Sequence, residues 1–182
     1  SLLAIDPDNG KLKWYFQFTP HDLYDFDSLQ TPVLVDRKYH GKPSKLLIEA
    51  NRNGFLYVLD RTSGEFLSAT PFVKKLTWAK GIDAHGRPIA PISEPTSDGT
   101  LICPGVIGAT NWFSPTYSEK TGLFYVMALE ACSVYFRKPA PFAEGSTYYS
   151  GGTKRSPEAS SQKVLLAFDP ETQTFAWQYP QI

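Results

Sequence analysis

The sequence predicts an all-β protein, and two observations support this prediction. Aromatic residues make up 14% of the chain, which also contains 15 prolines and 13 glycines, a composition typical of short strands joined by many turns. An apolar run, an Asp, a polar turn and a second strand-like run follow one another three times, within residues 2–14, 56–68 and 165–177. We therefore expect repeated β-hairpins and almost no helix.

The turn of each repeat has a simple chemical explanation. An Asp opens the turn in every copy, where its side chain can accept hydrogen bonds from backbone amides; the three are Asp6, Asp60 and Asp169. Gly10 and Gly64 supply the positive φ that such hairpins often need. Gln173 replaces this glycine in the last copy, so we expect a different turn there.

Two further strand-like segments precede each of the later hairpins, at 31–36 and 45–50 and at 113–117 and 123–127. Four antiparallel strands per unit, repeated along the chain, are typical of the blades of a β-propeller. Long irregular connections in such a compact fold are usually functional. The expected division is a half blade over 1–18, a blade over about 31–70, a long connection over 71–111, and a blade over about 112–178 with an insertion at 138–162.

Charge and hydropathy argue against several classes of protein. The formal net charge is zero and no basic run occurs, so nothing favours nucleic acid or a membrane surface as a partner. No apolar run approaches the length of a membrane span, and no signal peptide opens the chain. Both ends fall within a repeat, so we expect a piece of a longer protein. Its open run of blades would leave strand edges unpaired, which favours self-association.

The stretch 19–28 concentrates acidic residues. Asp22, Asp25 and Asp27 lie within six residues, beside His21. In an extended segment, side chains two residues apart point the same way, so Asp25 and Asp27 would share one side. Two such carboxylates suit a hard cation, or one can bind the metal while the other acts as a base. The alternative is a solvated turn without chemistry.

Several segments resemble the pyrroloquinoline-quinone (PQQ) dependent alcohol dehydrogenases, the quinoprotein methanol and ethanol dehydrogenases. They are the repeat ending at Trp14, the loop Thr19-Pro20-His21-Asp22 with Asp25, the turn Asn51-Arg52-Asn53-Gly54 with the strand 57–61, the loop Pro104-Gly105 through Gly108-Ala109-Thr110-Asn111-Trp112, and the segment 117–126. The resemblance covers nearly the whole chain. It implies that the chain is an internal part of an eight-bladed quinoprotein propeller.

The resemblance implies roles for two of the acids. Asp25 matches the catalytic base, which removes the hydroxyl proton of an alcohol while hydride leaves the carbon for the quinone. Asp27 matches an aspartate of the lanthanide-dependent branch, whereas many calcium enzymes have a small or uncharged residue there. The candidate metal ligands are thus Asp25 and Asp27, and the metal is Ca²⁺ or a lanthanide ion. The alternatives are a turn-capping Asp25 and a solvent-facing Asp27.

Two further residues match cofactor contacts of the family. Arg52 would contact the oxygens of PQQ, because a guanidinium offers paired donors to adjacent carbonyls. Asn111 matches an asparagine that bonds the cofactor. The alternatives are a surface arginine at 52, and at 111 a turn-stabilising asparagine beside a buried Trp112.

We expect the three histidines and Asp22 to have no role in the chemistry. We expect His21 and Asp22 to shape the loop that presents Asp25. His40 and His85 lie in turn-like stretches with no clear partner, so we expect both to face solvent.

The two cysteines, Cys103 and Cys132, form no zinc pattern. The family often has a disulfide between adjacent cysteines beside the cofactor, and that element is absent from this stretch. The remaining metal ligands and the tryptophan on which the quinone stacks are also not identifiable here. The chain alone therefore holds part of one active site.

Two functions from different classes explain these features. The first is PQQ-dependent oxidation of a small alcohol to an aldehyde, with electrons passed to a cytochrome c-type acceptor in the periplasm, as the family resemblance implies. The second is a non-catalytic propeller scaffold of the outer-membrane assembly type. The scaffold explains the three hairpins but not the match of Asp25, Asp27, Arg52 and Asn111 to family positions.

Overall fold

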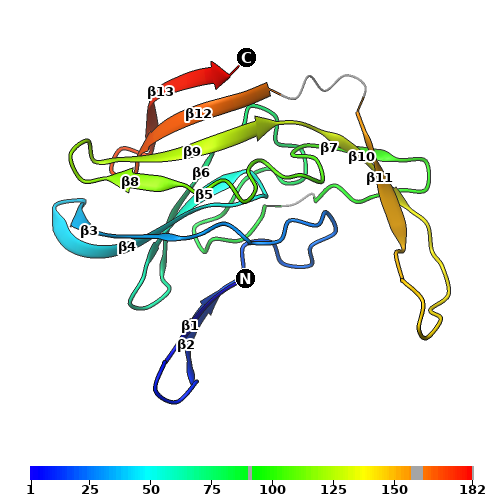
Figure 1. Cartoon of the computed structure of the whole chain (residues 1–182), viewed down its shortest axis with the longest axis horizontal. Coiled ribbons are helices and arrows are strands. Elements are labelled where there is room, and N and C mark those ends of the chain that lie inside the picture. Colours follow the sequence, from blue (N-terminus) through cyan, green and yellow to red (C-terminus); the bar gives the residue numbers. More distant parts are fainter. Residues whose placement is uncertain (90–91, 157–161, 182) are drawn as a thin grey trace.

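The computed structural model describes residues 1–89, 92–156 and 162–181 as thirteen strands joined by turns and loops (Figure 1). Within these ranges there is no helix, and accordingly none that is long and apolar enough to cross a membrane. The prediction of an all-β protein with almost no helix is therefore confirmed.

Two four-stranded antiparallel sheets form the body of the molecule (Figure 1). The first has the order β3-β4-β5-β6, with β3 at Val33–Tyr39, β4 at Lys42–Ala50, β5 at Phe55–Asp60 and β6 at Phe66–Pro71. The second has the order β8-β9-β12-β13, with β8 at Thr116–Ser118, β9 at Leu123–Glu130, β12 at Gln162–Asp169 and β13 at Thr174–Gln181. Four antiparallel strands in simple order are the blade of a β-propeller.

A third sheet lies to one side of the two blades and was not expected from the sequence (Figure 1). It has the order β11-β10-β7, with β7 at Thr100–Ile102, β10 at Ser133–Arg137 and β11 at Gly151–Arg155. The expectation of purely irregular stretches at 71–111 and 138–162 was wrong, because each supplies a strand that pairs with β10. Residues 157–161 of the second stretch lie outside the described residues.

The three repeats form the same hairpin, including the copy that lacks glycine. The amide of Gly10 donates to the carbonyl of Asp6 at 2.8 Å, and Gln173 donates to Asp169 in the same way at 2.9 Å. Gln173 has φ 57°, so it adopts the left-handed conformation that glycine adopts elsewhere. The expectation of a different turn at Gln173 was therefore wrong. The first hairpin pairs β1, Leu2–Ile5, with β2, Leu12–Phe16, as a separate two-stranded sheet.

The core has two parts, one on each face of the first blade. Leu46 and Ile48 of β4 join a cluster that includes Phe124 and Phe168 of the second blade, so the two blades pack face to face. The intervening Leu47 points to the opposite face and joins an aromatic cluster built from the loop after β2 and from neighbouring segments. The central strands are thus buried on both faces, which explains their nearly continuous apolar sequences.

Candidate functional site

The loop that follows β2, the acidic loop of residues 19–28, is fixed by the carboxylate of Asp22. Asp22 accepts the amide N–H of Tyr24 at 2.8 Å through Oδ1 and that of Phe26 at 2.7 Å through Oδ2. Burial raises the pKa of the Asp22 carboxyl, and the two amide hydrogen bonds oppose this shift. Asp25, between the two amides, has φ 63°. The expected role of Asp22 in shaping this loop is confirmed, whereas the expectation of an extended segment was wrong.

Alternating residues of the loop point to opposite sides. Tyr24 and Phe26 are each 1% exposed and pack around Trp78, whereas Asp25 and Asp27 are exposed. Tyr24 is tied further, because its carbonyl accepts the hydroxyl of Tyr135 at 3.0 Å and its own hydroxyl donates to the carbonyl of Ser93. Burial raises the pKa of Tyr24 to about 12, so its phenol remains a donor at neutral pH. The aromatic anchors therefore hold the two acids in solvent.

Arg52 joins these two acids. Its side chain is 7% exposed, and its guanidinium lies 3.7 Å from Asp25 (Nη2 to Oδ2) and 3.9 Å from Asp27 (Nη1 to Oδ2). Nη2 also donates to the carbonyl of Val106. Because the Arg52 side chain is buried, it is not the surface arginine of the alternative interpretation. Asp25 and Asp27 thus converge on one cation, although Asp25 has a left-handed backbone conformation and the segment is not extended.

The turn that carries Arg52, between β4 and β5, is anchored by two asparagines. Asn53 Nδ2 donates to Thr19 Oγ1 at 3.1 Å, and its carbonyl accepts the indole N–H of Trp78 at 2.7 Å. Asn51 Nδ2 donates to Ser28 Oγ at 2.9 Å and to Glu49 Oε1 at 3.0 Å. Both ends of the acidic loop are therefore bonded to this turn.

Glu49 is a buried acid with no ion-pair partner among the described residues. Its side chain is 1% exposed, and burial raises the pKa of its carboxyl to about 7, while the Asn51 hydrogen bond opposes that shift. Neutralisation is the usual response of a carboxyl that is buried without a positive charge nearby. Glu49 therefore supports the turn mainly as a neutral hydrogen-bonding group below neutral pH.

The loop 104–112 covers the other side of Arg52. Ala109 donates its amide to the Arg52 carbonyl at 2.8 Å, and a Cβ at Gly108 would lie 2.7 Å from Arg52 Cβ. Asn111 bonds locally, since its Nδ2 donates to the Ile107 carbonyl at 2.8 Å. Trp112 is 77% exposed, so the expectation of a buried Trp112 was wrong. The structure shows Asn111 stabilising a turn and does not show it beside Asp25.

A disulfide fastens this loop. Cys103 is bonded to Cys132 across 29 residues, and the amide of Gly105 donates to the carbonyl of Ala131 at 2.8 Å. The presence of two cysteines was the one indication of this pairing, because the strands that bring them together belong to the third sheet. The bridge links the loop that covers Arg52 to β10, which carries Tyr135.

The histidines divide into three environments. His21 has φ 51° and lines the cavity described below. His85 is exposed, as expected, but its amide donates to Asp83 Oδ1 at 2.8 Å, so the expectation that it has no partner was wrong. His40 is exposed too, but the expectation that it has no partner was wrong: its amide donates to Glu171 Oε1 at 2.8 Å, and its Nδ1 lies 3.6 Å from the same atom.

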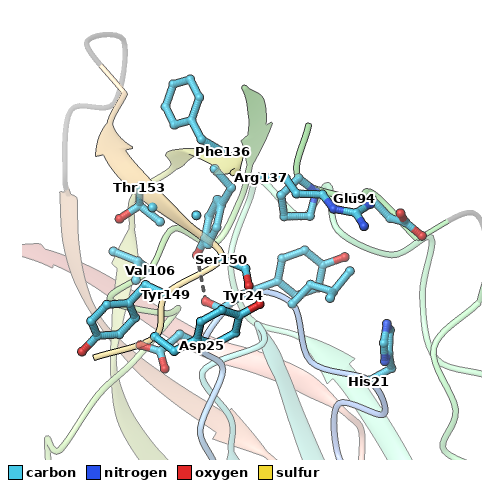
Figure 2. A pocket seen from close by; sticks show the side chains of 16 residues that line it. His21, Tyr24, Asp25, Glu94, Val106, Phe136, Arg137, Tyr149, Ser150 and Thr153 are labelled. Atoms are coloured by element: carbon cyan, nitrogen blue, oxygen red, sulfur yellow. Dashed lines mark hydrogen bonds between the residues drawn. The ribbon is translucent and has the colours of Figure 1, made fainter. Parts of the chain in front are cut away.

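A cavity of about 780 Å³ opens beside Asp25 (Figure 2). The acidic loop forms one wall through His21, Leu23 and Tyr24, and the β10–β11 hairpin forms the opposite wall. In Figure 2, Asp25 and Tyr149 lie at one end of the cavity, and Arg137 and Glu94 lie at the other. A carboxylate at the end of a mainly apolar cavity can act as a proton acceptor for a group bound there.

The described residues supply only part of a metal site. Nowhere in the described ranges do three or more His, Cys, Asp or Glu side chains come together to hold an ion. Asp25 and Asp27 lie beyond direct hydrogen-bonding distance of Arg52, so their oxygens keep acceptor capacity for a hard cation. The donor set fits a cation whose remaining ligands come from elsewhere, and it fits an anionic or carbonyl-bearing group placed against Arg52.

Comparisons with known proteins define the class. Residues 1–74 match the family model of the β-propeller domain of glucose, ethanol and alcohol dehydrogenases. The quinoprotein alcohol dehydrogenase PedH of Pseudomonas putida is 39% identical over 188 residues, covering 98% of this chain and 32% of the relative. The lanthanide-dependent methanol dehydrogenase of Methylorubrum extorquens is 33% identical over 196 residues, covering 100% of this chain and 33% of the relative.

Solved structures of alcohol and methanol dehydrogenases have the same fold over nearly the whole chain. The crystal structure of quinohemoprotein alcohol dehydrogenase from Comamonas testosteroni superposes with a TM-score of 0.91 at 34% identity, covering 99% of this chain and 28% of that one. A europium-containing methanol dehydrogenase superposes with a TM-score of 0.87 at 31% identity, covering 98% of this chain and 32% of that one. The two four-stranded sheets are therefore propeller blades of the quinoprotein type. The chain belongs to the PQQ-dependent alcohol dehydrogenase family and spans about a third of the length of the curated relatives it matches.

Proposed function

We propose that the complete protein oxidises an alcohol to an aldehyde with PQQ as the hydride acceptor, and that Asp25 is the general base. The observation that carries this proposal is the convergence of two exposed carboxylates, Asp25 and Asp27, on the buried guanidinium of Arg52 at the end of an open cavity. A non-catalytic scaffold would have no use for this arrangement. The relatives named above, which are alcohol and methanol dehydrogenases, support the same function.

The exposure of Asp25 supports its proposed role as the base. Its carboxylate is 64% exposed on the side chain and stands 3.7 Å from Arg52, so its oxygens are not saturated by that cation. An alcohol in the cavity would donate its hydroxyl proton to an Asp25 oxygen as its carbon loses hydride. The quinone, when bound, supplies the two-electron acceptor for that hydride. Asp22 and Tyr135 hold the backbone on either side of the base.

Arg52 and Asn111 are the proposed cofactor contacts in this chain. The guanidinium of Arg52 offers donors in a fixed plane, which suits adjacent carbonyl oxygens. It is held for this purpose by the Val106 carbonyl and by the two acids. Asn111 would have to exchange its bond to the Ile107 carbonyl for one to the cofactor.

Asp27, together with Asp25, is the proposed metal contact. A hard cation would bind these oxygens and polarise the reactive carbonyl of the cofactor. A trivalent lanthanide ion favours an additional carboxylate ligand more strongly than Ca²⁺ does, and Asp27 would supply that carboxylate. The names of a lanthanide-dependent and a europium-containing methanol dehydrogenase among the relatives support this choice. The metal remains Ca²⁺ or a lanthanide ion in the proposal.

The partner and the location follow from the family. One relative is the 1-butanol dehydrogenase (cytochrome c) of Thauera butanivorans, 42% identical over 129 residues, covering 70% of this chain and 18% of the relative. We extend to the complete protein a cytochrome c-type electron acceptor and a periplasmic location. Neither nucleic acid nor a membrane surface is part of the proposal.

The substitution Asp25→Asn in the complete protein tests the proposal. It keeps the side-chain shape but removes the proton acceptor, so turnover should fall by about a hundred- to ten-thousand-fold while PQQ stays bound. Alcohol oxidation with an artificial electron acceptor measures turnover, and absorbance of the purified protein measures bound PQQ. Asp36→Asn is the matched control, since Asp36 is an exposed acid on β3 paired with Arg61. Full activity of the Asp25→Asn protein would remove the base from this loop.

A further inference from the structure

We infer that Glu49 is a positioning residue for the proposed reaction, and that it acts through Asn51 on the acidic loop. The inference rests on the proposed function, because this loop carries Asp25 and Asp27, the base and the metal contacts of that proposal. It gives a role to a buried acid that the proposed function does not use.

Glu49 occupies a position at which an apolar side chain would be expected. It is 1% exposed on β4, an inner strand of its blade, and its neighbours Ile48 and Ala50 are buried as well. Burial raises the pKa of its carboxyl to about 7, because a charge is unfavourable there. An acid in such a place indicates a hydrogen bond that an apolar residue could not make. That bond is the one that Glu49 Oε1 accepts from Asn51 Nδ2 at 3.0 Å.

This hydrogen bond fixes the direction in which the side-chain amide of Asn51 faces. With Nδ2 directed at Glu49, the second N–H of that nitrogen is left for Ser28 Oγ at 2.9 Å, and Oδ1 is left to accept the backbone amide of Asn53 at 3.1 Å. Asn51 is 0% exposed, so bulk water cannot replace a partner that is lost. The orientation of one amide therefore holds both the turn around Arg52 and the end of the acidic loop.

A second connection of the same kind holds the beginning of the acidic loop. Tyr57 of β5 is the cross-strand partner of Glu49, and its hydroxyl accepts Asn53 Nδ2 at 2.9 Å. The same nitrogen donates to Thr19 Oγ1 at 3.1 Å. Two adjacent strands of the blade thus each reach one end of the loop through an asparagine beside Arg52. Glu49 and Tyr57 are the groups from which these two connections start.

The acids of the proposed site lie between these two ends. Asp25 and Asp27 are 3.7 and 3.9 Å from Arg52, which is too long for direct hydrogen bonds. Exposed ion pairs of this kind contribute little by themselves to holding a side chain in place. Ser28 follows Asp27 directly, so its bond to the Arg52 turn restrains the distance between the acids and the guanidinium.

Hydrogen–deuterium exchange of the complete protein tests this connection without relying on catalysis. Glu49→Leu removes the acceptor and leaves a buried N–H of Asn51 without a partner, so the amides of residues 19–28 should exchange about tenfold faster. Glu49→Gln keeps an oxygen acceptor and should restore the wild-type rates. Ser28→Ala removes the same connection from the other end and should act like Glu49→Leu.

A double variant shows whether the two residues act through one connection. Glu49→Leu combined with Ser28→Ala should exchange no faster in the loop than either single variant, whereas independent effects would multiply. Val58→Ala is the matched control, because Val58 is a fully buried residue of β5 that packs in the cluster shared with the second blade. It should lower the stability of the core and leave exchange of the acidic loop unchanged.

Alcohol oxidation by the same variants tests the consequence for the reaction. In the complete protein loaded with PQQ and metal, Glu49→Leu should lower kcat by about tenfold and change KM by less than about twofold, and Glu49→Gln should restore kcat. Exchange that responds as predicted in a protein that oxidises no alcohol would contradict the proposed function while supporting the connection from Glu49 to the loop. Wild-type exchange or unchanged kcat in Glu49→Leu, or a failure of Glu49→Gln to restore them, would overturn the inference.

Discussion

At the scale of single residues, the conformation of the candidate site depends on side chains that bond the backbone of their neighbours. Asp22 is the clearest case, because its two oxygens bond the amides on either side of Asp25. Its role could be predicted from its position in an acidic loop, but the left-handed conformation of Asp25 could not, since nothing in the residue type requires it. The convergence of Asp25 and Asp27 on Arg52 could not be predicted either, because Arg52 lies 27 positions after Asp25 in the sequence.

Removing the carboxylate of Asp27 should affect metal binding and not proton transfer. Asp27→Ala in the complete protein should lower the affinity for a lanthanide and the lanthanide-supported activity, with calcium-supported activity less affected. Equilibrium dialysis with each metal and parallel activity assays measure this. A solvated turn residue would give equal results for the variant and the wild type with both metals.

Glu49 should make the stability of the protein depend on pH. Burial raises its pKa from 4.5 to about 7, so the folded state holds a proton that the unfolded state releases. This stabilisation is complete below about pH 4.5 and is lost as pH rises through about 7, at most about 3 kcal/mol in all. Denaturant unfolding of the complete protein at pH 5 and pH 8 should show it.

The variant Glu49→Gln identifies the source of that pH dependence. An amide keeps an oxygen for the Asn51 hydrogen bond and has no proton to lose, so the difference between pH 5 and pH 8 should shrink. Glu119→Gln, at an exposed turn position, is the control and should keep the wild-type difference. An unchanged difference in Glu49→Gln would show that another group is responsible.

Elements with local patterns were predictable, and those with distant partners were not. The hairpins follow from an Asp, a left-handed turn residue and alternating strands that are adjacent in sequence. The third sheet joins short segments from three places, and β11, Gly151–Arg155, is exposed at every residue and shows no alternation. The same limit applies to the disulfide between Cys103 and Cys132, which depends on that sheet.

The equivalent turns of two repeats separate backbone conformation from packing. Gly10 has φ 71° with nothing near its missing Cβ, whereas a Cβ at Gly64, φ 77°, would lie 2.6 Å from the Trp14 ring. Gly10→Ala should cost about 1 kcal/mol of unfolding free energy from the left-handed conformation alone. Gly64→Ala should cost clearly more, because the ring must also move. Equal losses in chemical denaturation would show that Trp14 gives way freely.

At the scale of the whole molecule, the two blades and the third sheet present only part of a pocket. The described residues provide two acids and one guanidinium but no complete metal site. The isolated chain of 182 residues should therefore bind PQQ weakly or not at all, while the complete protein binds it tightly. Calorimetric titration of both proteins measures this difference. Tight stoichiometric binding by the isolated chain would show that the pocket lies within it.

The most direct test of the central claim is a crystal structure of the complete protein with PQQ and its metal. The loop of Asp25 and the turn of Arg52 should then frame the cofactor. We predict carboxylate oxygens of Asp25 and Asp27 within about 2.3–2.6 Å of the metal, and Arg52 within hydrogen-bonding distance of a quinone oxygen. A metal and a quinone bound away from these three side chains would contradict the proposed site.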